Sequence, residues 1–236
     1  MRKLFGLVIV FFSLPIFSQT STTAKPAHKP AAKAAAKPAT PAGPPTAIID
    51  TTAGKMTCTL FPDKAPIGVA NFAGLARGTK DWRNPSSGRK MHGVPLYNGT
   101  IFHRVIPEFM IQGGDPMGTG MGDPGYKFKN ETSPDLLFDR PGRLAYANAG
   151  PDTNGSQFFI TEVPYPSLNG GYTIFGQCDD PSVEIVKKIA RLPRNANDRP
   201  DDPPKINKIT ILHYGSHAPV HHPAPKPAAP KTTKQH

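Results

Sequence analysis

Short apolar segments separated by turn residues constrain this chain more than any other feature. In KMTCTLF, residues 55–61, Met, Cys and Leu alternate with Lys and Thr, which is the period of a strand with one buried face. Helical spacing occurs in two places, at 66–77 and after Ser182, which we expect to cap a short helix. The remaining strands are predicted at 47–50, 100–105, 109–113, 143–147, 157–161, 172–177 and 206–213. This pattern indicates a mainly β fold that is closed, or nearly closed, into a barrel.

The two ends of the chain have a different composition. Residues 1–18 contain the basic, apolar and small-residue parts of a secretory signal peptide. Their apolar run is shorter than the roughly 20 residues of a membrane span, so we expect cleavage near Ser18 rather than an uncleaved anchor. Residues 19–46, rich in Ala, Lys and Pro, and 215–236, rich in His, Pro and Lys, cannot bury enough apolar surface to offset chain entropy and are expected to be disordered. The folded domain is predicted at 47–214, about 165 residues.

The positive charge of the chain lies mainly in these flanks. Of a net charge of +11, nine charges belong to flanking Lys and Arg residues, which leaves +2 for the domain. We therefore expect no nucleic-acid binding by the domain. For the tails, weak contact with anionic envelope components, a role as a cell-envelope tether and a role as a plain spacer stay open. The signal segment predicts an exported protein in the periplasm, with secretion or envelope association as alternatives.

The chain has two cysteines, Cys58 and Cys178, and both fall in predicted strands. An exported protein can form a disulfide, so a bridge and two buried free thiols are both open. Their spacing matches no metal motif. The histidines at 217, 221 and 222 lie in a proline-rich tail. We expect neither a metal site nor a cofactor.

Two stretches carry the chemistry of the domain. The first, FHRVIPEFMIQGGD at 102–115, combines one arginine and one glutamine with several large apolar side chains. The second is YANAGPDTNGSQFFIT at 146–161. This mix predicts a shallow apolar groove with one fixed cation. Such a groove suits rotation of the peptide bond before proline, whose barrier of about 18–20 kcal/mol comes from amide resonance and whose rotation requires no nucleophile or base.

Together the two stretches resemble the signature of the cyclophilin family of peptidyl-prolyl cis-trans isomerases. The resemblance implies an eight-stranded antiparallel β-barrel with an α-helix capping each end. It implies an isomerase that assists protein folding, acts on proline-containing unfolded or folding polypeptides and uses no cofactor. We expect it to be a monomer. A non-catalytic peptide-binding or chaperone module on the same fold is the main alternative.

The resemblance also assigns roles to individual residues. Arg104 stands at the catalytic arginine, and His103 supports the site. The wall of the proline pocket is expected to comprise Phe109, Met110, Phe159, Leu168 and Tyr172. Residues that grip the substrate backbone are expected to be Gln112, Ala147, Asn148 and Gln157. Phe158 must face away from Phe159 in a strand, so we assign Phe158 and Phe102 to the core.

The sequence departs from the family pattern at two positions. The tryptophan at the pocket rim of many eukaryotic cyclophilins falls on Ser167, and the pocket histidine falls on Tyr172. Tyrosine keeps an aromatic wall and a hydroxyl, so isomerase activity should survive. Loss of the tryptophan removes a large rim contact, which predicts weak cyclosporin binding. The 81–94 loop is also longer than in minimal cyclophilins.

Overall fold

The computed structural model describes residues 43–215, so the predicted signal peptide, most of the 19–46 linker and the tail after residue 215 lie outside the described residues. An eight-stranded antiparallel sheet dominates the fold, with strand order β10-β1-β2-β9-β7-β8-β6-β5. The strands are β1 (Thr46–Thr51), β2 (Gly54–Leu60), β5 (Arg104–Ile106), β6 (Met110–Gly113), β7 (Arg143–Tyr146), β8 (Phe158–Thr161), β9 (Ile174–Cys178) and β10 (Ile206–Leu212). The mainly β prediction is therefore confirmed.

The ladder of this sheet runs from β10 at one edge to β5 at the other. Within residues 43–215 no ladder joins these two edge strands. The segments beside them do meet, because Ile101 forms an isolated bridge with Lys205 and the Phe102 N–H donates to the Pro204 carbonyl at 3.0 Å. The sheet is thus strongly curled, and full closure into a barrel stays a prediction.

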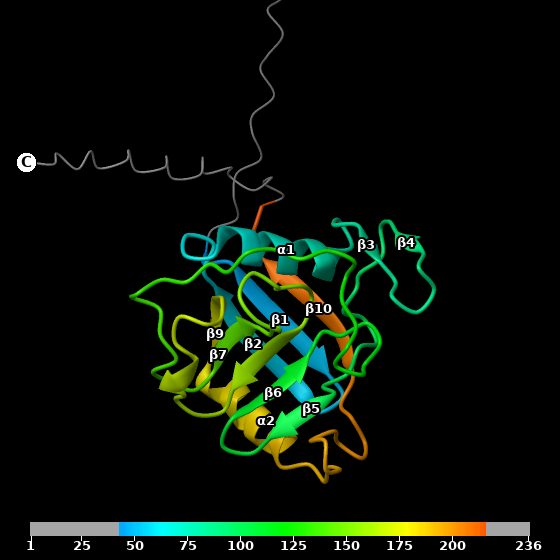
Figure 1. The fold of residues 1–236 in the computed structure, drawn as a ribbon. Helices are drawn as coiled ribbons and strands as arrows, with labels where there is room; N and C mark the ends of the chain where they lie inside the picture. The colour runs from blue at the N-terminus through cyan, green and yellow to red at the C-terminus, as the bar shows by residue number, and fades with distance from the viewer. Residues whose placement is uncertain (1–42, 216–236) are drawn as a thin grey trace, which may run out of the picture. The chain divides into compact units, whose positions relative to one another are not determined.

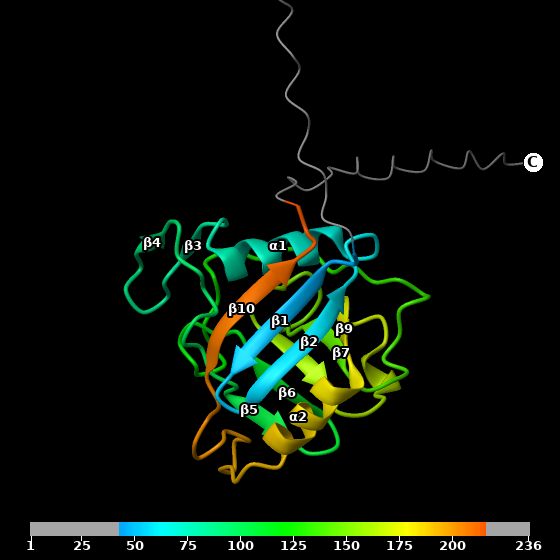
Figure 2. The same cartoon turned by 180° about the vertical axis from the view of Figure 1, so that it is seen from behind.

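Two α-helices cover the ends of the curled sheet, as Figures 1 and 2 show from opposite sides. Helix α1 (Pro66–Arg77) begins with a proline, whose missing N–H and fixed φ suit the first turn, and ends at Gly78 with φ 73°. Helix α2 (Asp180–Ala190) is capped by Asp179, whose side chain accepts from the Ser182 N–H. Our prediction that Ser182 caps this helix was wrong. Ser182 lies in the first turn, and its hydroxyl contacts the backbone of Thr57 in β2.

The main core fills the space between the sheet and the helices. Phe72 of α1 packs against Phe158 and Phe175 at ring-centroid distances of 5.5 and 5.0 Å. Cys58 and Cys178 lie directly opposite each other on β2 and β9 and form a disulfide. Of the two alternatives left open by the sequence, a bridge and two free thiols, the structure has the bridge. In the described part of the chain, neither helix is long and apolar enough to cross a membrane.

Some boundaries differ from the sequence-based expectation. Strand β5 begins at Arg104 rather than at residue 100, because the Phe102 N–H bonds to the Pro204 carbonyl instead of to a neighbouring strand of the ladder. The 81–94 loop contains a small hairpin of β3 (Trp82–Arg83) and β4 (Lys90–Met91), which projects from the body of the domain in Figures 1 and 2. The indole N–H of Trp82 donates to the Val94 carbonyl at 2.8 Å and fixes the base of the hairpin.

Candidate active site

Strand register places the predicted catalytic arginine in a row with two other predicted site residues. Arg104 of β5 lies opposite Gln112 of β6, and Gln112 lies opposite Phe159 of β8. Neighbouring strands are about 4.8 Å apart, so this row spans a peptide-sized distance across three strands. Arg104 is partly exposed while Val105 is buried, as strand alternation requires. Arg104 therefore presents its guanidinium on the side of the sheet away from the main core.

A chain of side-chain amides fixes the neighbours of Arg104. The Arg104 Nη1 donates to Gln112 Oε1 at 3.5 Å, and Gln112 Nε2 donates to Gln157 Oε1 at 2.9 Å. Gln157 Nε2 in turn donates to the carbonyls of Gly120 and Gly122 at 3.0 and 2.8 Å. Each amide thus has a defined orientation, and two backbone carbonyls anchor the far end of the chain of hydrogen bonds.

Asp115 organises the glycine-rich loop that supplies those carbonyls. Its buried carboxylate accepts from the backbone N–H groups of Met117, Thr119, Gly120 and Gly122 at 2.6–3.1 Å. Burial alone would raise the pKa of Asp115, but these four N–H donors favour the ionised form and hold the pKa below its usual range. The loop at 115–122 is therefore folded around one buried negative charge.

The predicted proline-pocket residues gather in one apolar cluster, separate from the main core. The buried members are Met110, Phe138, Ala145, Phe159 and Ile174. The partly buried members include Phe109, Ala147, Leu168 and Tyr172. The rings of Phe159 and Tyr172 meet edge to face at 5.5 Å. Phe158 and Phe102 belong to the main core, so the predicted division between Phe158 and Phe159 is confirmed.

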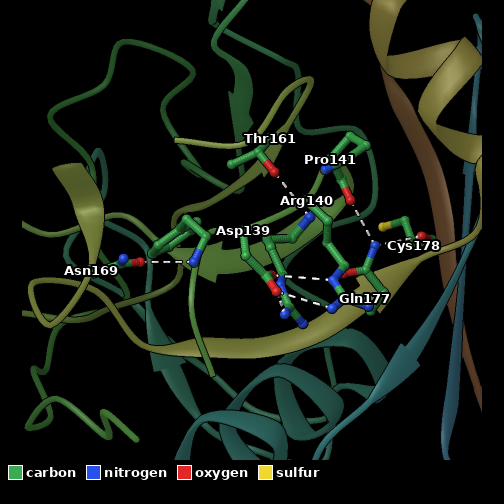
Figure 3. A network of polar contacts seen from close by, with 9 residues as sticks. Asp139, Arg140, Pro141, Thr161, Asn169, Gln177 and Cys178 are labelled. Atoms are coloured by element: carbon green, nitrogen blue, oxygen red, sulfur yellow. Dashed lines mark hydrogen bonds and ion pairs between the residues drawn. The ribbon is translucent and has the colours of Figure 1, made fainter. Parts of the chain in front are cut away.

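Phe138 forms part of this cluster, although no pattern in the sequence pointed to it. Its ring stacks on Phe159 at 5.8 Å and meets Tyr172 edge to face at 6.5 Å. Figure 3 shows the polar network around the segment that follows it. The Asp139 carboxylate accepts hydrogen bonds from Arg140 and Arg143. These bonds hold the pKa of Asp139 far below its usual range, and the bond from Arg140 is the larger cause.

Longer-range hydrogen bonds tie the same segment to Asn169 and to strand β9, as Figure 3 also shows. The Phe138 N–H donates to Asn169 Oδ1 at 2.8 Å, and Gln177 Nε2 donates to the Pro141 carbonyl at 2.8 Å. These contacts keep Phe138 beneath Phe159. The segment has no regular period, so only the folded structure reveals that Phe138 packs in this cluster.

The four residues predicted to grip a peptide backbone line one cavity of about 330 Å³. They are Gln112, Ala147, Asn148 and Gln157. The Ala147 N–H donates to the Gln157 carbonyl at 3.0 Å. The Asn148 side chain is held by two other backbone groups, because its oxygen accepts from the Gly150 N–H of its own turn at 3.2 Å and its amide donates to the Gly171 carbonyl, 23 residues away, at 3.0 Å. Asn148 thus borders the cavity with a side chain that already has backbone partners.

His103 lies behind the site. Its side chain is buried beside Gly120, where an added Cβ would lie 3.5 Å from the imidazole. Burial lowers the pKa of His103, and although Asp115 opposes this shift, the net direction is downward. His103 is therefore neutral near pH 7 and packs against the glycine-rich loop.

Within residues 43–215 no group of three or more His, Cys, Asp or Glu side chains is arranged to hold a metal ion. The histidines at 217, 221 and 222 lie outside the described residues. The fold and the site together define an antiparallel β protein that places one cation, Arg104, and a set of hydrogen-bonded side-chain amides beside the apolar cluster. Those are the requirements for rotating a peptide bond before proline.

Comparisons with known proteins give the family. The family "Cyclophilin type peptidyl-prolyl cis-trans isomerase/CLD" matches residues 46–211. Peptidyl-prolyl cis-trans isomerase A of Mycobacterium tuberculosis (H37Rv) is 52% identical over 172 residues, which cover 72% of this chain and 94% of that protein. Peptidyl-prolyl cis-trans isomerase B of Streptomyces anulatus is 47% identical over 167 residues, which cover 70% and 95%.

A solved structure gives the same result. The cyclophilin-type isomerase of Cryptosporidium parvum, in the presence of the dipeptide Ala-Pro, has a TM-score of 0.60 and 37% identity, covering 72% of this chain and 99% of that one. This chain belongs to the cyclophilin-type peptidyl-prolyl cis-trans isomerases, and the expected enzyme class is confirmed. The non-catalytic alternative loses its support.

The two departures from the family pattern have defined places in the structure. Ser167 is exposed in a short 3₁₀ helix, Pro166–Leu168. Tyr172 packs against Phe159 and Phe138, so an aromatic wall is present where the pocket histidine is expected. Tyr165, which the sequence did not single out, meets Phe109 at 4.4 Å and adds a further aromatic pair beside the cluster.

Proposed function

We propose that Arg104 is the catalytic cation of this isomerase. Rotation of an X-Pro bond breaks amide resonance, and the proline nitrogen regains a lone pair as the bond twists. A guanidinium beside the twisted bond can hydrogen-bond the substrate and place positive charge near that nitrogen. The observation that carries this proposal is the row formed by Arg104, Gln112 and Phe159 across three adjacent strands.

The other predicted residues then have complementary roles. In this proposal Phe109, Met110, Phe159, Leu168 and Tyr172 seat the proline ring, away from water. Gln112, Gln157, Ala147 and Asn148 hold the flanking substrate backbone along the cavity. His103 acts indirectly, by supporting the glycine-rich loop from behind. Because the amides are already fixed by hydrogen bonds, little ordering is required when the substrate binds.

An isomerisation assay on an Ala-Pro test peptide tests the role of Arg104. Arg104→Ala should lower kcat/KM by about 100-fold or more, the effect typical of losing one electrostatic group that acts on the transition state. Arg89→Ala is the matched control, because Arg89 is an exposed arginine of the β3–β4 hairpin. Equal rates for the Arg104 variant and the wild type would contradict the mechanism.

We further propose that the enzyme is exported and acts as a monomer on proline-containing unfolded or folding chains. The signal-like residues 1–18 support export, and so does the Cys58–Cys178 disulfide, because disulfides persist in oxidising compartments. The Ala-Pro dipeptide named with the Cryptosporidium relative supports the substrate class. Envelope retention of the full chain, compared with a chain lacking 216–236, separates a tether from a spacer, and recovery of the full chain in the cytoplasm would contradict export.

We also propose that the curled sheet behaves as a closed barrel. The bonds that support closure lie at the seam between the β5 and β10 edges. The Ile206 N–H donates to the Thr100 carbonyl and the Gly99 N–H to the Ile206 carbonyl, each at 2.8 Å. With the Phe102–Pro204 bond, these contacts join the two edges through backbone groups.

A further inference from the structure

The loop that follows helix α2 contacts the strand of the catalytic arginine. The Val105 N–H of β5 donates to the Asp198 carbonyl at 2.8 Å. The Asp198 carboxylate lies 3.8 Å from Arg104 Nε and 3.2 Å from Arg194 Nε. A residue 94 positions after Arg104 thus meets β5 twice, through its backbone at Val105 and through its side chain at Arg104.

The backbone around Asp198 holds this carboxylate in place. Asp198 has φ 60°, in the left-handed region that aspartate, asparagine and glycine tolerate best. Its N–H donates to the Asn195 carbonyl at 3.0 Å. Asn195 Oδ1 accepts from the Asn197 and Arg199 N–H groups at 2.9 and 3.1 Å. The turn is therefore closed by its own hydrogen bonds before any contact with Arg104 is counted.

A second contact fastens the turn to the other side of the site. The Arg199 side chain donates to the Gly118 carbonyl, which belongs to the glycine-rich loop organised by Asp115. The turn at 194–200 thus bridges β5 and the loop that anchors Gln157. A movement of this turn would therefore displace the guanidinium of Arg104.

We propose that Asp198 is a positioning residue for Arg104. The guanidinium is planar, so a carboxylate paired with its Nε edge at 3.8 Å favours the orientation in which the opposite edge faces away from that carboxylate. Arg104 Nη1 is the atom that reaches Gln112. Asp198 therefore turns the Nη edge toward Gln112 and the substrate. This inference rests on the proposed catalytic role of Arg104.

Arg194 is a second cationic partner of the Asp198 carboxylate. Asp198 carries one negative charge and contacts two guanidinium groups, so the three side chains together retain one positive charge. Arg194 Nε is also closer to Asp198 than Arg104 Nε is. Asp198 thus orients Arg104 while sharing its charge with a second arginine.

Asp198→Gly and Asp198→Asn test the carboxylate without removing the turn, since both residues tolerate the left-handed conformation. Each should lower kcat about tenfold with KM changed less than about twofold, because a displaced catalytic group loses transition-state contacts. In both variants, the Arg104 Nε–H resonance in the ¹⁵N NMR spectrum should shift. Asp202→Asn, an exposed carboxylate of the same loop, is the matched control and should match the wild type.

The outcomes separate this inference from the proposed function. If Arg104→Ala retains wild-type activity, the role of Arg104 itself is wrong. If Arg104→Ala loses activity while both Asp198 variants keep the wild-type kcat or exceed it, only the positioning role is overturned. An equal loss in Asp202→Asn, or a loss confined to KM with an unmoved Arg104 resonance, would also overturn it.

Discussion

Asp115→Asn should weaken both the stability of the domain and its catalysis. One carboxylate oxygen of Asp115 accepts from Thr119, Gly120 and Gly122, and the other accepts from Met117. An asparagine oxygen can replace only one of the two, so at least one N–H donor then faces an NH₂ group. The remaining bonds reach a neutral acceptor in place of a charged one.

The magnitude follows from these bonds. A hydrogen bond to a charged group contributes about 1.5–3 kcal/mol and a neutral one about 1 kcal/mol. Loss of one bond and weakening of the others should lower the free energy of unfolding by about 2–4 kcal/mol. For a domain of this size each kcal/mol shifts Tm by roughly 2–4 °C. We therefore expect Tm to fall by about 5–15 °C at pH 7.

The effect should depend on pH in a defined direction. The pKa of Asp115 in the folded protein lies below its usual value near 3.8, so its ionised form stabilises the fold above that pH. This contribution is lost as the pH falls through the folded-state pKa. The difference in unfolding free energy between wild type and Asp115→Asn should therefore be full above about pH 5 and shrink below pH 4.

Urea unfolding and the isomerisation assay together check this reasoning. Asp135→Asn is the control, because Asp135 is an exposed partner of Lys64 at 3.4 Å and should change stability by less than about 0.5 kcal/mol. Catalysis by Asp115→Asn should also fall, since the carbonyls of Gly120 and Gly122 anchor Gln157. An Asp115→Asn protein as stable as the control, or a stability gap that widens in acid, would refute the account.

Two further predictions concern the pocket rim at Ser167 and the seam between the β5 and β10 edges. Cyclosporin should bind much more weakly than to a cyclophilin with tryptophan at the rim, because Ser167 offers little contact surface; a calorimetric titration giving nanomolar affinity would contradict this. In hydrogen exchange, the amides of Phe102 and Ile206 should be protected nearly as well as that of Ile111 in the sheet, because a closed seam opens only with the domain. Exchange there at the rate of an exposed loop would instead show an open sheet.

The features that depend on backbone periodicity could be predicted from the sequence. Phe158 and Phe159 must face opposite sides of any strand, and the structure places them in the main core and in the apolar cluster. The cap of helix α2 was harder to predict. Asp179 and Ser182 are both good capping residues and lie three positions apart. The sequence alone therefore does not indicate which of the two is the N-cap.

The contacts made by irregular segments could not be predicted. Phe138 and Asp198 lie in stretches without any period, and each reaches the site only because the completed fold brings distant segments together. The disulfide was undecided for a similar reason. Whether Cys58 and Cys178 pair depends on the order of the strands, which alternation along one strand does not encode.

The adjacency of the first and last strands has a mechanical consequence. Thr46 at the start of β1 lies opposite Leu212 at the end of β10, and an added Cβ on Gly43 would lie 3.3 Å from the His213 ring. Tension applied between the two flanks would therefore pull β1 and β10 apart from one end and load their hydrogen bonds one after another. Such peeling resists force far less than shear along the strands. The ladder between β1 and β10 is therefore where a stretched molecule would open first.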